Sequence, residues 1–252
     1  ITFAQSITPN PRRLEVLFLG DNGHHKPMDR AAQIMAGLGP KGINFTYTDQ
    51  LEDINDKNLA KYDAILVYAN WDEISKSAER SLLNFVASGK GILPIHCASY
   101  CFRNSQEYVK MVGGQFWRHT VDTVQANILK SYDPLMKGVG TIRSYDETYL
   151  HTQLQSDNNV LMVREIKEDQ WKDKPSVKTE PYTWTRKYGL GNVFYTAYGH
   201  DENTWSNKGF QQLIYNGILF VVKDNALADF NARNPKPFEF KEAFLPNYEK
   251  RE

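Results

Sequence analysis

Near its beginning the chain contains the apolar stretch Leu14-Glu15-Val16-Leu17-Phe18-Leu19-Gly20, followed after two residues by Gly23-His24-His25-Lys26-Pro27. The first stretch predicts a buried β-strand, and Pro27 is typical of the first turn of a helix. A strand that leads directly into a helix indicates an open α/β sheet, in which ligands bind at the carboxyl ends of the strands. The two adjacent imidazoles therefore mark a candidate site, because histidine suits proton transfer or metal binding near neutral pH.

The same alternation of strand and helix continues along the chain and predicts an α/β fold with a mostly parallel sheet. The near-continuous apolar run at residues 62–68 is typical of a central parallel strand that is covered on both faces. From about Asn225 we expect irregular, proline-rich chain. The predicted helices cover residues 28–38, 77–88 and 210–222, and the predicted strands cover residues 14–20, 43–48, 62–68, 91–95, 121–129, 160–166 and 192–198.

Length and composition exclude several classes of protein. The 252 residues fit a single α/β domain. The 30 basic and 30 acidic residues leave no net charge, so no bulk field attracts nucleic acid or acidic membranes. No apolar run approaches the length of a membrane span. Aromatic residues make up 13% of the chain, which suits a core, a carbohydrate-binding face or a partner surface.

The two ends of the chain differ from the middle, and we divide it at residues 14 and 223. Residues 1–13 form an N-terminal segment whose start, Ile1-Thr2-Phe3-Ala4-Gln5-Ser6, resembles the end of a cleaved secretory signal. Export would place the protein in a periplasm or outside the cell, and a cytoplasmic protein with an unremarkable terminus is the alternative. Residues 14–223 form the α/β domain. Residues 224–252 are an arm or the start of a linker.

Histidines and acids recur near the ends of the predicted strands. Imidazoles together with a carboxylate fit zinc or a similar divalent ion, or an acid–base set without metal. Their separations are long and irregular, unlike a compact helical metal motif, so a structural role for any single histidine is the default. Adjacent side chains point apart, so we expect only one of the first two to take part. The set comprises His24, His25, His96, His119 and His200 with Asp146 and Glu147.

Cys97 follows a predicted strand and is a candidate nucleophile, because a strand-to-helix turn exposes its side chain. His200 and Glu202 could complete a triad with it. Alternatively Cys97 is a small buried residue, as cysteines often are. No glycine lies one or two positions beyond it, so a strained elbow is not clearly specified.

Aromatic and basic side chains near the same loops are candidates for binding a sugar. Trp71 and Trp205 each follow a predicted strand on the loop side and suit a platform under a sugar ring. Arg118, beside His119, suits an anionic or hydroxyl-rich ligand, or a surface ion pair. Tyr149 belongs to the same group of rings, for most of which core packing is the expected role.

Taken together, five segments resemble, in order, the motifs of the ThuA-like (trehalose-utilisation) family. The resemblance spans about residues 14 to 223. It implies a three-layer α/β/α fold similar to class I glutamine amidotransferases, with a flavodoxin-like sheet, and a link to disaccharides and their keto derivatives. The segments are Gly20-Asp21-Asn22-Gly23-His24-His25, Ile95-His96-Cys97-Ala98, Gly113-Gly114-Gln115-Phe116-Trp117-Arg118-His119, Asp146-Glu147-Thr148-Tyr149 and Gly191-Asn192-Val193-Phe194-Tyr195-Thr196-Ala197-Tyr198-Gly199-His200.

Carried over by residue, the family's motif histidines fall on His25, His96, His119 and His200, and its acidic pair falls on Asp146 and Glu147. The amidotransferases that it resembles have a Gly-x-Cys-x-Gly elbow and a His-Pro-Glu. This chain has His96-Cys97-Ala98-Ser99 and His200-Asp201-Glu202 instead. The missing glycines and proline count against glutaminase activity.

We therefore expect an exported ThuA-like protein that acts on a sugar, disaccharide or keto-sugar derivative as a hydrolase, lyase or isomerase. The chemistry would be acid–base, with or without a divalent metal such as zinc. The alternatives are a Cys97-dependent amidohydrolase or amidotransferase, and a non-catalytic module that binds glycans or a partner. Further modules or a second copy of the chain are the expected protein partners. The catalytic candidates are His25, His96, His119, Glu147, His200 and Cys97, the substrate-binding candidates are Trp71, Arg118, Tyr149 and Trp205, and the metal-ligand candidates are His25, His96, His119 and His200.

Overall fold

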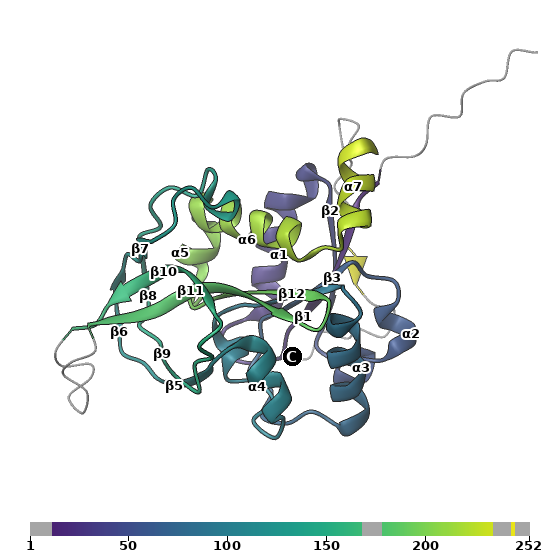
Figure 1. Ribbon diagram of the computed structural model, residues 1–252, viewed down its shortest axis with the longest axis horizontal. Coiled ribbons are helices and arrows are strands. Elements are labelled where there is room, and N and C mark those ends of the chain that lie inside the picture. The colour runs from purple at the N-terminus through teal and green to yellow at the C-terminus, as the bar shows by residue number, and fades with distance from the viewer. Residues whose placement is uncertain (1–11, 168–177, 234–242, 245–252) are drawn as a thin grey trace, which may run out of the picture.

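The computed structural model describes residues 12–167, 178–233 and 243–244, and within them nine strands form the main sheet (Figure 1). The strand order is β13-β2-β1-β3-β4-β12-β11-β10-β7. The bounds are β1 (Leu14–Leu19), β2 (Ile43–Thr48), β3 (Ala64–Val67), β4 (Gly91–Pro94), β7 (Asn127–Ile128), β10 (Asn159–Glu165), β11 (Thr179–Tyr188), β12 (Gly191–Thr196) and β13 (Ala243–Phe244).

The larger part of this sheet is parallel, as the sequence predicts. Each neighbouring pair from β13 through to β12 is parallel, whereas β11, β10 and β7 continue the sheet antiparallel. In the register of β1, Leu17 pairs with Thr46 on one side and Ile65 on the other. Every residue of β3 is buried, as expected for a strand covered on both faces. Parallel strands bring their carboxyl ends to one edge, where the candidate histidines lie.

Helices pack on both faces of this sheet. Figure 1 shows α1 (Pro27–Leu38) and α6 (Lys208–Val221) above the strands and α3 (Lys76–Ala87) and α4 (Gln106–Val112) below them. Both α6 and α3 pack against β4 and β12. The remaining helices are α2 (Asp56–Leu59), α5 (Glu202–Ser206) and α7 (Asp224–Arg233), and the 3₁₀ turns are η1 (Gly39–Lys41), η2 (Leu51–Asp53), η3 (His96–Ser99) and η4 (Pro134–Met136).

The helix boundaries follow from local chemistry. Pro27 begins α1, and the helix then buries Ala31, Ile34 and Leu38 at helical spacing. Ser75 precedes α3 and its hydroxyl accepts a hydrogen bond from the Ala78 N–H, which satisfies one free donor of the first turn. At the start of α6 the Asn207 side chain likewise accepts hydrogen bonds from the N–H groups of Gly209 and Phe210.

Between β4 and β10 the structure differs from the prediction of one strand over residues 121–129. That segment divides into β6 (Val121–Val124), which pairs with β8 (Ser144–Glu147) in a small sheet, and β7 on the edge of the main sheet. The strand breaks because the Ala126 N–H donates to the Tyr198 hydroxyl at 2.7 Å and therefore does not pair with a neighbouring strand. A second small sheet pairs β5 (Gln115–Arg118) with β9 (Leu150–Thr152). The strands β5, β8, β9 and β11 were not predicted from the sequence.

After residue 223 the structure contradicts the prediction of irregular chain from about Asn225. Residues 224–233 form α7, which packs against β1, and its Phe230 is buried. Nε of Arg12 lies 3.6 Å from a carboxylate oxygen of Asp229 on the same helix. The proposed arm beyond it falls mostly outside the described residues.

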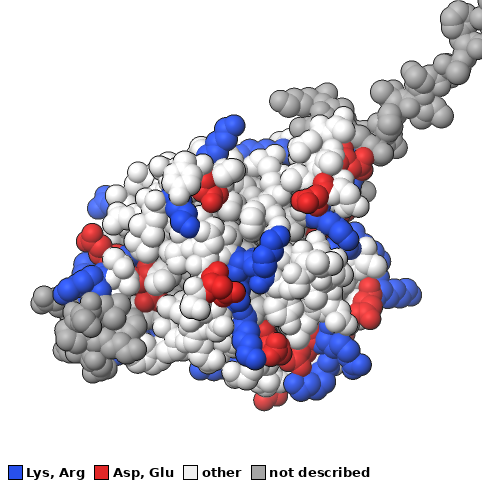
Figure 2. Space-filling view, viewed as in Figure 1, with Lys and Arg blue, Asp and Glu red and all other residues white. Residues whose placement is uncertain are grey.

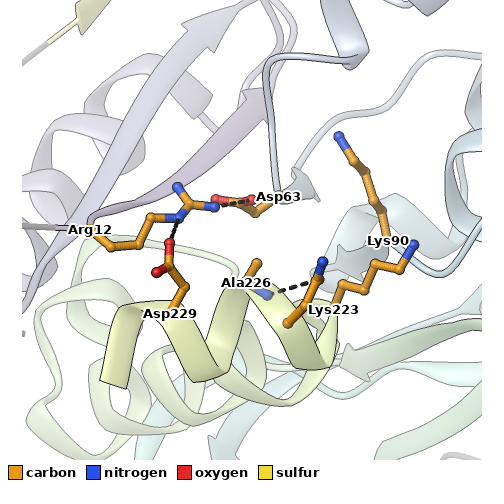
Figure 3. Close-up of a pocket in the computed structure, with 7 residues that line it drawn as sticks. Arg12, Asp63, Lys90, Lys223, Ala226 and Asp229 are labelled. Carbon is orange, nitrogen blue, oxygen red and sulfur yellow. Dashed lines mark hydrogen bonds and ion pairs between the residues drawn. The ribbon is translucent and has the colours of Figure 1, made fainter. Parts of the chain in front are cut away.

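A cavity of about 600 Å³ lies at the amino ends of the parallel strands, away from the histidines (Figure 3). Its charged side chains have partners within the protein: Nη2 of Arg12 lies 2.6 Å from Asp63, and Lys90 donates to the backbone carbonyls of Ala60 and Tyr62. On the face drawn in Figure 2, acidic and basic side chains are interspersed. None of the described helices combines the length and apolar character needed to cross a bilayer.

If α7 belongs to the cooperative core, Phe230→Ala should lower the free energy of unfolding by about 3 kcal/mol, because it empties a buried aromatic position. Urea denaturation followed by tryptophan fluorescence measures this. Asn231→Ala, on an exposed position of the same helix, is the matched control and should change little. An unchanged midpoint for Phe230→Ala would mean that α7 contributes nothing to the fold.

Candidate functional site

Four histidines surround the carboxylate of Glu147 at the carboxyl edge of the sheet. They come from separate loops: His25 follows β1, His96 follows β4, His119 follows β5 and His200 follows β12. The distances to the nearest Glu147 carboxylate oxygen are 3.1 Å from Nε2 of His96, 3.3 Å from Nδ1 of His200, 3.5 Å from Nδ1 of His119 and 3.9 Å from Nε2 of His25. The topology thus brings together residues that lie up to 175 positions apart (200 minus 25).

The cluster is closed on one side and open on the other. His96 is fully buried, and the side chains of His25 and Glu147 are only 4% and 8% exposed. The side chains of His200 and His119 are 28% and 36% exposed. A ligand from solvent therefore meets His119 and His200 first.

The backbone at His96 is held in an unusual conformation. Its φ of 51° lies in the left-handed region, which costs a non-glycine residue free energy and persists only where surrounding contacts impose it. One such contact is a hydrogen bond from Nδ1 of His96 to the Ala197 carbonyl, 2.6 Å long. The ring of Tyr149 stacks on the imidazole with centroids 4.2 Å apart. These contacts direct Nε2 of His96 toward Glu147.

Asp146, next to Glu147, has a different role. It is fully buried and accepts hydrogen bonds from the Gly199 N–H at 3.0 Å, the His200 N–H at 3.2 Å and the Thr204 hydroxyl at 2.7 Å. Burial raises the pKa of Asp146. The two neighbouring carboxyl groups diverge as expected, so that Asp146 holds the loop after β12 while Glu147 faces the imidazoles.

Two residues that the sequence analysis did not single out support the site from the loop after β3. Nδ2 of Asn70 lies 3.3 Å from Nδ1 of His25, and the Asn70 N–H donates to the Asp21 carboxylate. The Tyr68 hydroxyl donates to the Gly199 carbonyl at 2.6 Å. Their position at the end of a buried strand, on the same edge as the histidines, was the available signal.

The sixth histidine, His151, supports the cluster from beneath. It is buried, with Nδ1 2.8 Å from Glu180 and Nε2 2.9 Å from the Tyr195 hydroxyl. That hydroxyl in turn lies 3.1 Å from the His96 carbonyl and donates to it. His151 therefore helps to fix the η3 turn and does not face the opening.

The charges of the cluster depend on one another. Burial lowers the pKa of His25 to about 4, so this ring is neutral. Burial alone would raise the pKa of Glu147, but its interactions with His200, His25 and His96 outweigh that effect and hold the pKa well below its usual range. The same carboxylate raises the pKa of His200.

The other predicted catalytic residue, Cys97, is buried, and burial raises the pKa of its thiol well above the usual value. His200, its expected partner, approaches Glu147 instead, and Glu202 is exposed at the start of α5. The arrangement required for the triad is therefore not found among these residues.

The predicted substrate-binding residues fall in different environments. Trp205 is fully buried, with its indole N–H donating to the Gly199 carbonyl at 2.9 Å, so no face of its ring meets a ligand. Trp71 is half-buried against the core and donates to the Gly20 carbonyl. Arg118 lies over the exposed ring of Trp117, 4.0 Å from its centroid. Tyr149 lies within the cluster, between His96 and Phe116.

Within the described residues, His25, His96, Glu147 and His200 each offer one ligand atom, and these atoms all lie within 4.8 Å of one another. Such a group can hold a metal ion. It differs from the predicted set of four histidines in one respect, because Glu147 takes the place of His119. The exposed His119 contacts the carboxylate from outside this group.

Comparison with known proteins agrees with this fold. The ThuA family model, described as trehalose utilisation, matches residues 15–221. ThuA-like structures from Parabacteroides merdae and Bacteroides uniformis share 18% and 16% identity, with TM-scores of 0.69 and 0.70. The matches cover 83% and 89% of this chain and 90% and 98% of theirs. At these identities the likeness establishes the fold alone.

A protein from Salmonella typhimurium, described as cytoplasmic, shares 13% identity with a TM-score of 0.60, over 84% of this chain and all of its own. Among curated proteins, no sequence matches the chain.

The burial of Cys97 predicts that the folded protein resists thiol reagents. Both cysteines are buried, and the Cys101 thiol donates to the Ala69 carbonyl, so neither presents a thiolate at neutral pH. Absorbance with Ellman's reagent should rise slowly for the native protein and reach two thiols per chain only in concentrated guanidinium. Rapid reaction of one thiol in the folded protein would contradict this and revive the nucleophile hypothesis for Cys97.

Proposed function

Since this chain belongs to the ThuA (trehalose utilisation) family, we propose that it acts on a sugar, specifically a disaccharide or its keto derivative, at the cluster around Glu147. The observation that supports this most is the convergence of four imidazoles from four loops on one nearly buried carboxylate. Groups that exchange protons near neutral pH are seldom gathered in this way by packing alone. The proposal includes the three-layer, flavodoxin-like arrangement, which the helices on both faces and the strand order β2-β1-β3-β4-β12 support.

The roles follow from exposure. His119 and His200 are reached from solvent, so they and Glu147 are the groups that would exchange protons with the substrate. His25 and His96 hold the carboxylate from its buried side. Removal of a proton next to a sugar carbonyl generates an enolate, whose oxygen needs a positive partner. Arg118, whose Nε and Nη2 atoms are buried without a hydrogen-bond partner among the described residues, is the cation that we assign to this task.

Isomerase or lyase chemistry on a keto sugar fits the cluster better than hydrolysis by paired carboxylates. Glycosidases of that kind need two acids at a defined separation on either side of the bond. Here Asp146 is fully buried, and its oxygens accept hydrogen bonds from the loop after β12 and from Thr204. Glu147 alone of the pair faces the imidazoles.

Aromatic rings beside the opening suit a sugar ring. Phe116 packs on Tyr149 with centroids 4.5 Å apart, and both rings lie within 6 Å of His119. Apolar ring faces next to hydrogen-bonding groups are the usual surroundings of a bound sugar. Phe116, the partly exposed ring of the pair, replaces Trp205 as the proposed contact surface, and the buried Tyr149 supports it.

The test is a screen of disaccharides and their keto derivatives, with conversion followed by proton NMR. For a converted substrate, Glu147→Gln should lower kcat/KM at least about 100-fold, the usual effect of removing a general acid or base. His119→Gln should also lower kcat/KM. His24→Gln is the matched control and should leave turnover nearly unchanged, because His24 packs on His25 with ring centroids 4.0 Å apart but is exposed and outside the contacts of Glu147.

Full activity of Glu147→Gln would remove this cluster from the reaction. Calorimetric binding of a sugar without conversion, with equal affinity in Glu147→Gln, would instead identify a non-catalytic binding module.

A further inference from the structure

We infer that His25, His96, His200 and Glu147 form a binding site for one divalent transition-metal ion of the zinc class. The inference deepens the proposed function and rests on it for what the ion serves, although binding is measured without any sugar. Three imidazole nitrogens and one carboxylate oxygen are a donor set that zinc prefers, whereas magnesium and calcium favour oxygen ligands.

The distances suit such an ion. Zinc binds nitrogen and oxygen ligands at roughly 2.0–2.2 Å, so the ligand atoms of a tetrahedral site lie about 3.4 Å from one another. Nε2 of His96 and Nδ1 of His200 lie 3.1 Å and 3.3 Å from the Glu147 oxygens, and Nε2 of His25 lies 3.9 Å away. Because all four ligand atoms fall within 4.8 Å of one another, small side-chain adjustments complete the site.

The hydrogen bonding of His96 requires a cation next to Nε2. The Ala197 carbonyl can only accept, so Nδ1 of His96 bears the hydrogen of their 2.6 Å hydrogen bond. In the neutral ring Nε2 then presents a lone pair to the Glu147 oxygen 3.1 Å away. Two lone pairs at that distance repel unless a proton or a metal ion lies between them. A second ring nitrogen that donates to a backbone carbonyl is also the usual support of a metal-binding histidine.

Two further ring nitrogens of the cluster lack partners. Nε2 of His25 and Nδ1 of His200 are buried and have no hydrogen bond of acceptable geometry among the described residues. A buried polar atom without a partner is costly, so its presence calls for an explanation such as an ion. Both atoms face the same carboxylate as His96.

Asn70 allows His25 to serve as a ligand. Its Oδ1 is also buried without a partner, and its amide lies beside Nδ1 of His25. With Oδ1 turned to the ring, Nδ1 of His25 donates to it, and Nε2 offers its lone pair to the cluster. The same rotation satisfies the amide oxygen.

A proton on His96 accounts for fewer of these ring nitrogens than a metal ion does. Protonation of His96 would pair it with Glu147 but would leave the nitrogens of His25 and His200 without partners. One divalent ion contacts all three rings and the carboxylate together. With an ion bound, His200 and Glu147 serve as ligands, and His119, outside the set on the side that is open to solvent, is the group that exchanges protons with the substrate.

The experiment is titration of chelator-treated protein with Co²⁺, followed by competition with Zn²⁺. We expect one ion per chain by elemental analysis, and the intense visible absorption of tetrahedral cobalt, which Zn²⁺ abolishes. His96→Ala and Glu147→Gln should each weaken affinity at least about 100-fold, because loss of a ligand costs no less than loss of its supporting groups. His24→Gln and His119→Gln should keep the cobalt spectrum, since neither residue is in the proposed ligand set.

Urea denaturation of each variant shows whether it is folded. If His96→Ala does not fold, His25→Gln serves as the second variant that lacks a proposed ligand. Absence of Co²⁺ and Zn²⁺ binding, or equal binding by the wild-type protein and Glu147→Gln, would overturn the inference. Its failure is distinct from that of the proposed function. A metal-loaded protein inert toward every sugar contradicts only the function, and undiminished turnover by a protein that binds no ion contradicts only the metal centre.

Discussion

The geometry of the site depends on the hydrogen bonds that the buried carboxylate of Asp146 accepts. A buried charge is costly unless hydrogen bonds compensate it, and Asp146 receives them from Gly199, His200 and Thr204. These bonds join β8, in a small sheet outside the main one, to the loop after β12 and to α5. Glu147 is the next residue of β8, so it is placed above the carboxyl edge by its neighbour. Without that attachment the imidazoles would have no common partner.

The turn after β4 places an imidazole where the sequence suggested a cysteine nucleophile. A strained turn after a strand is a general way to expose a reactive side chain above a sheet. Here the residue in the left-handed conformation is His96, while Cys97 lies buried behind it. Gly199 permits this close approach, since a Cβ there would lie 3.0 Å from that of His96. The structure therefore directs the imidazole of His96, and not the thiol of Cys97, toward Glu147 at a position where the sequence left both residues as candidates.

Much of the fold was predictable because apolar runs and helix-capping residues act locally. The parallel strands β1 to β4 and the helices α1, α3 and α6 were predicted to within a few residues. The strands β5, β8 and β9 were missed because they are short and pair with strands at least 20 positions away. The strand β11 pairs with the adjacent β12 and was missed because its apolar pattern is interrupted. In β11 the residues from Tyr182 to Thr185 are all buried, but Pro181 before them and the charged Arg186 and Lys187 after them interrupt the strand pattern. The helix α7 was missed because its apolar face is narrow, and it is stabilised by packing against β1.

The sequence by itself determined the α/β class, the mostly parallel sheet and the histidine-bearing motifs, because strand and helix periodicity and the turns between them are encoded over a few residues. Only the tertiary structure decided which of those histidines meet and that Glu147, not Asp146, is their shared partner. It also decided that Trp205 belongs to the core. These outcomes depend on burial and on hydrogen bonds between residues more than a hundred positions apart, such as His96 and Ala197. No local pattern records such contacts, because they exist only once the strands have been ordered into a sheet.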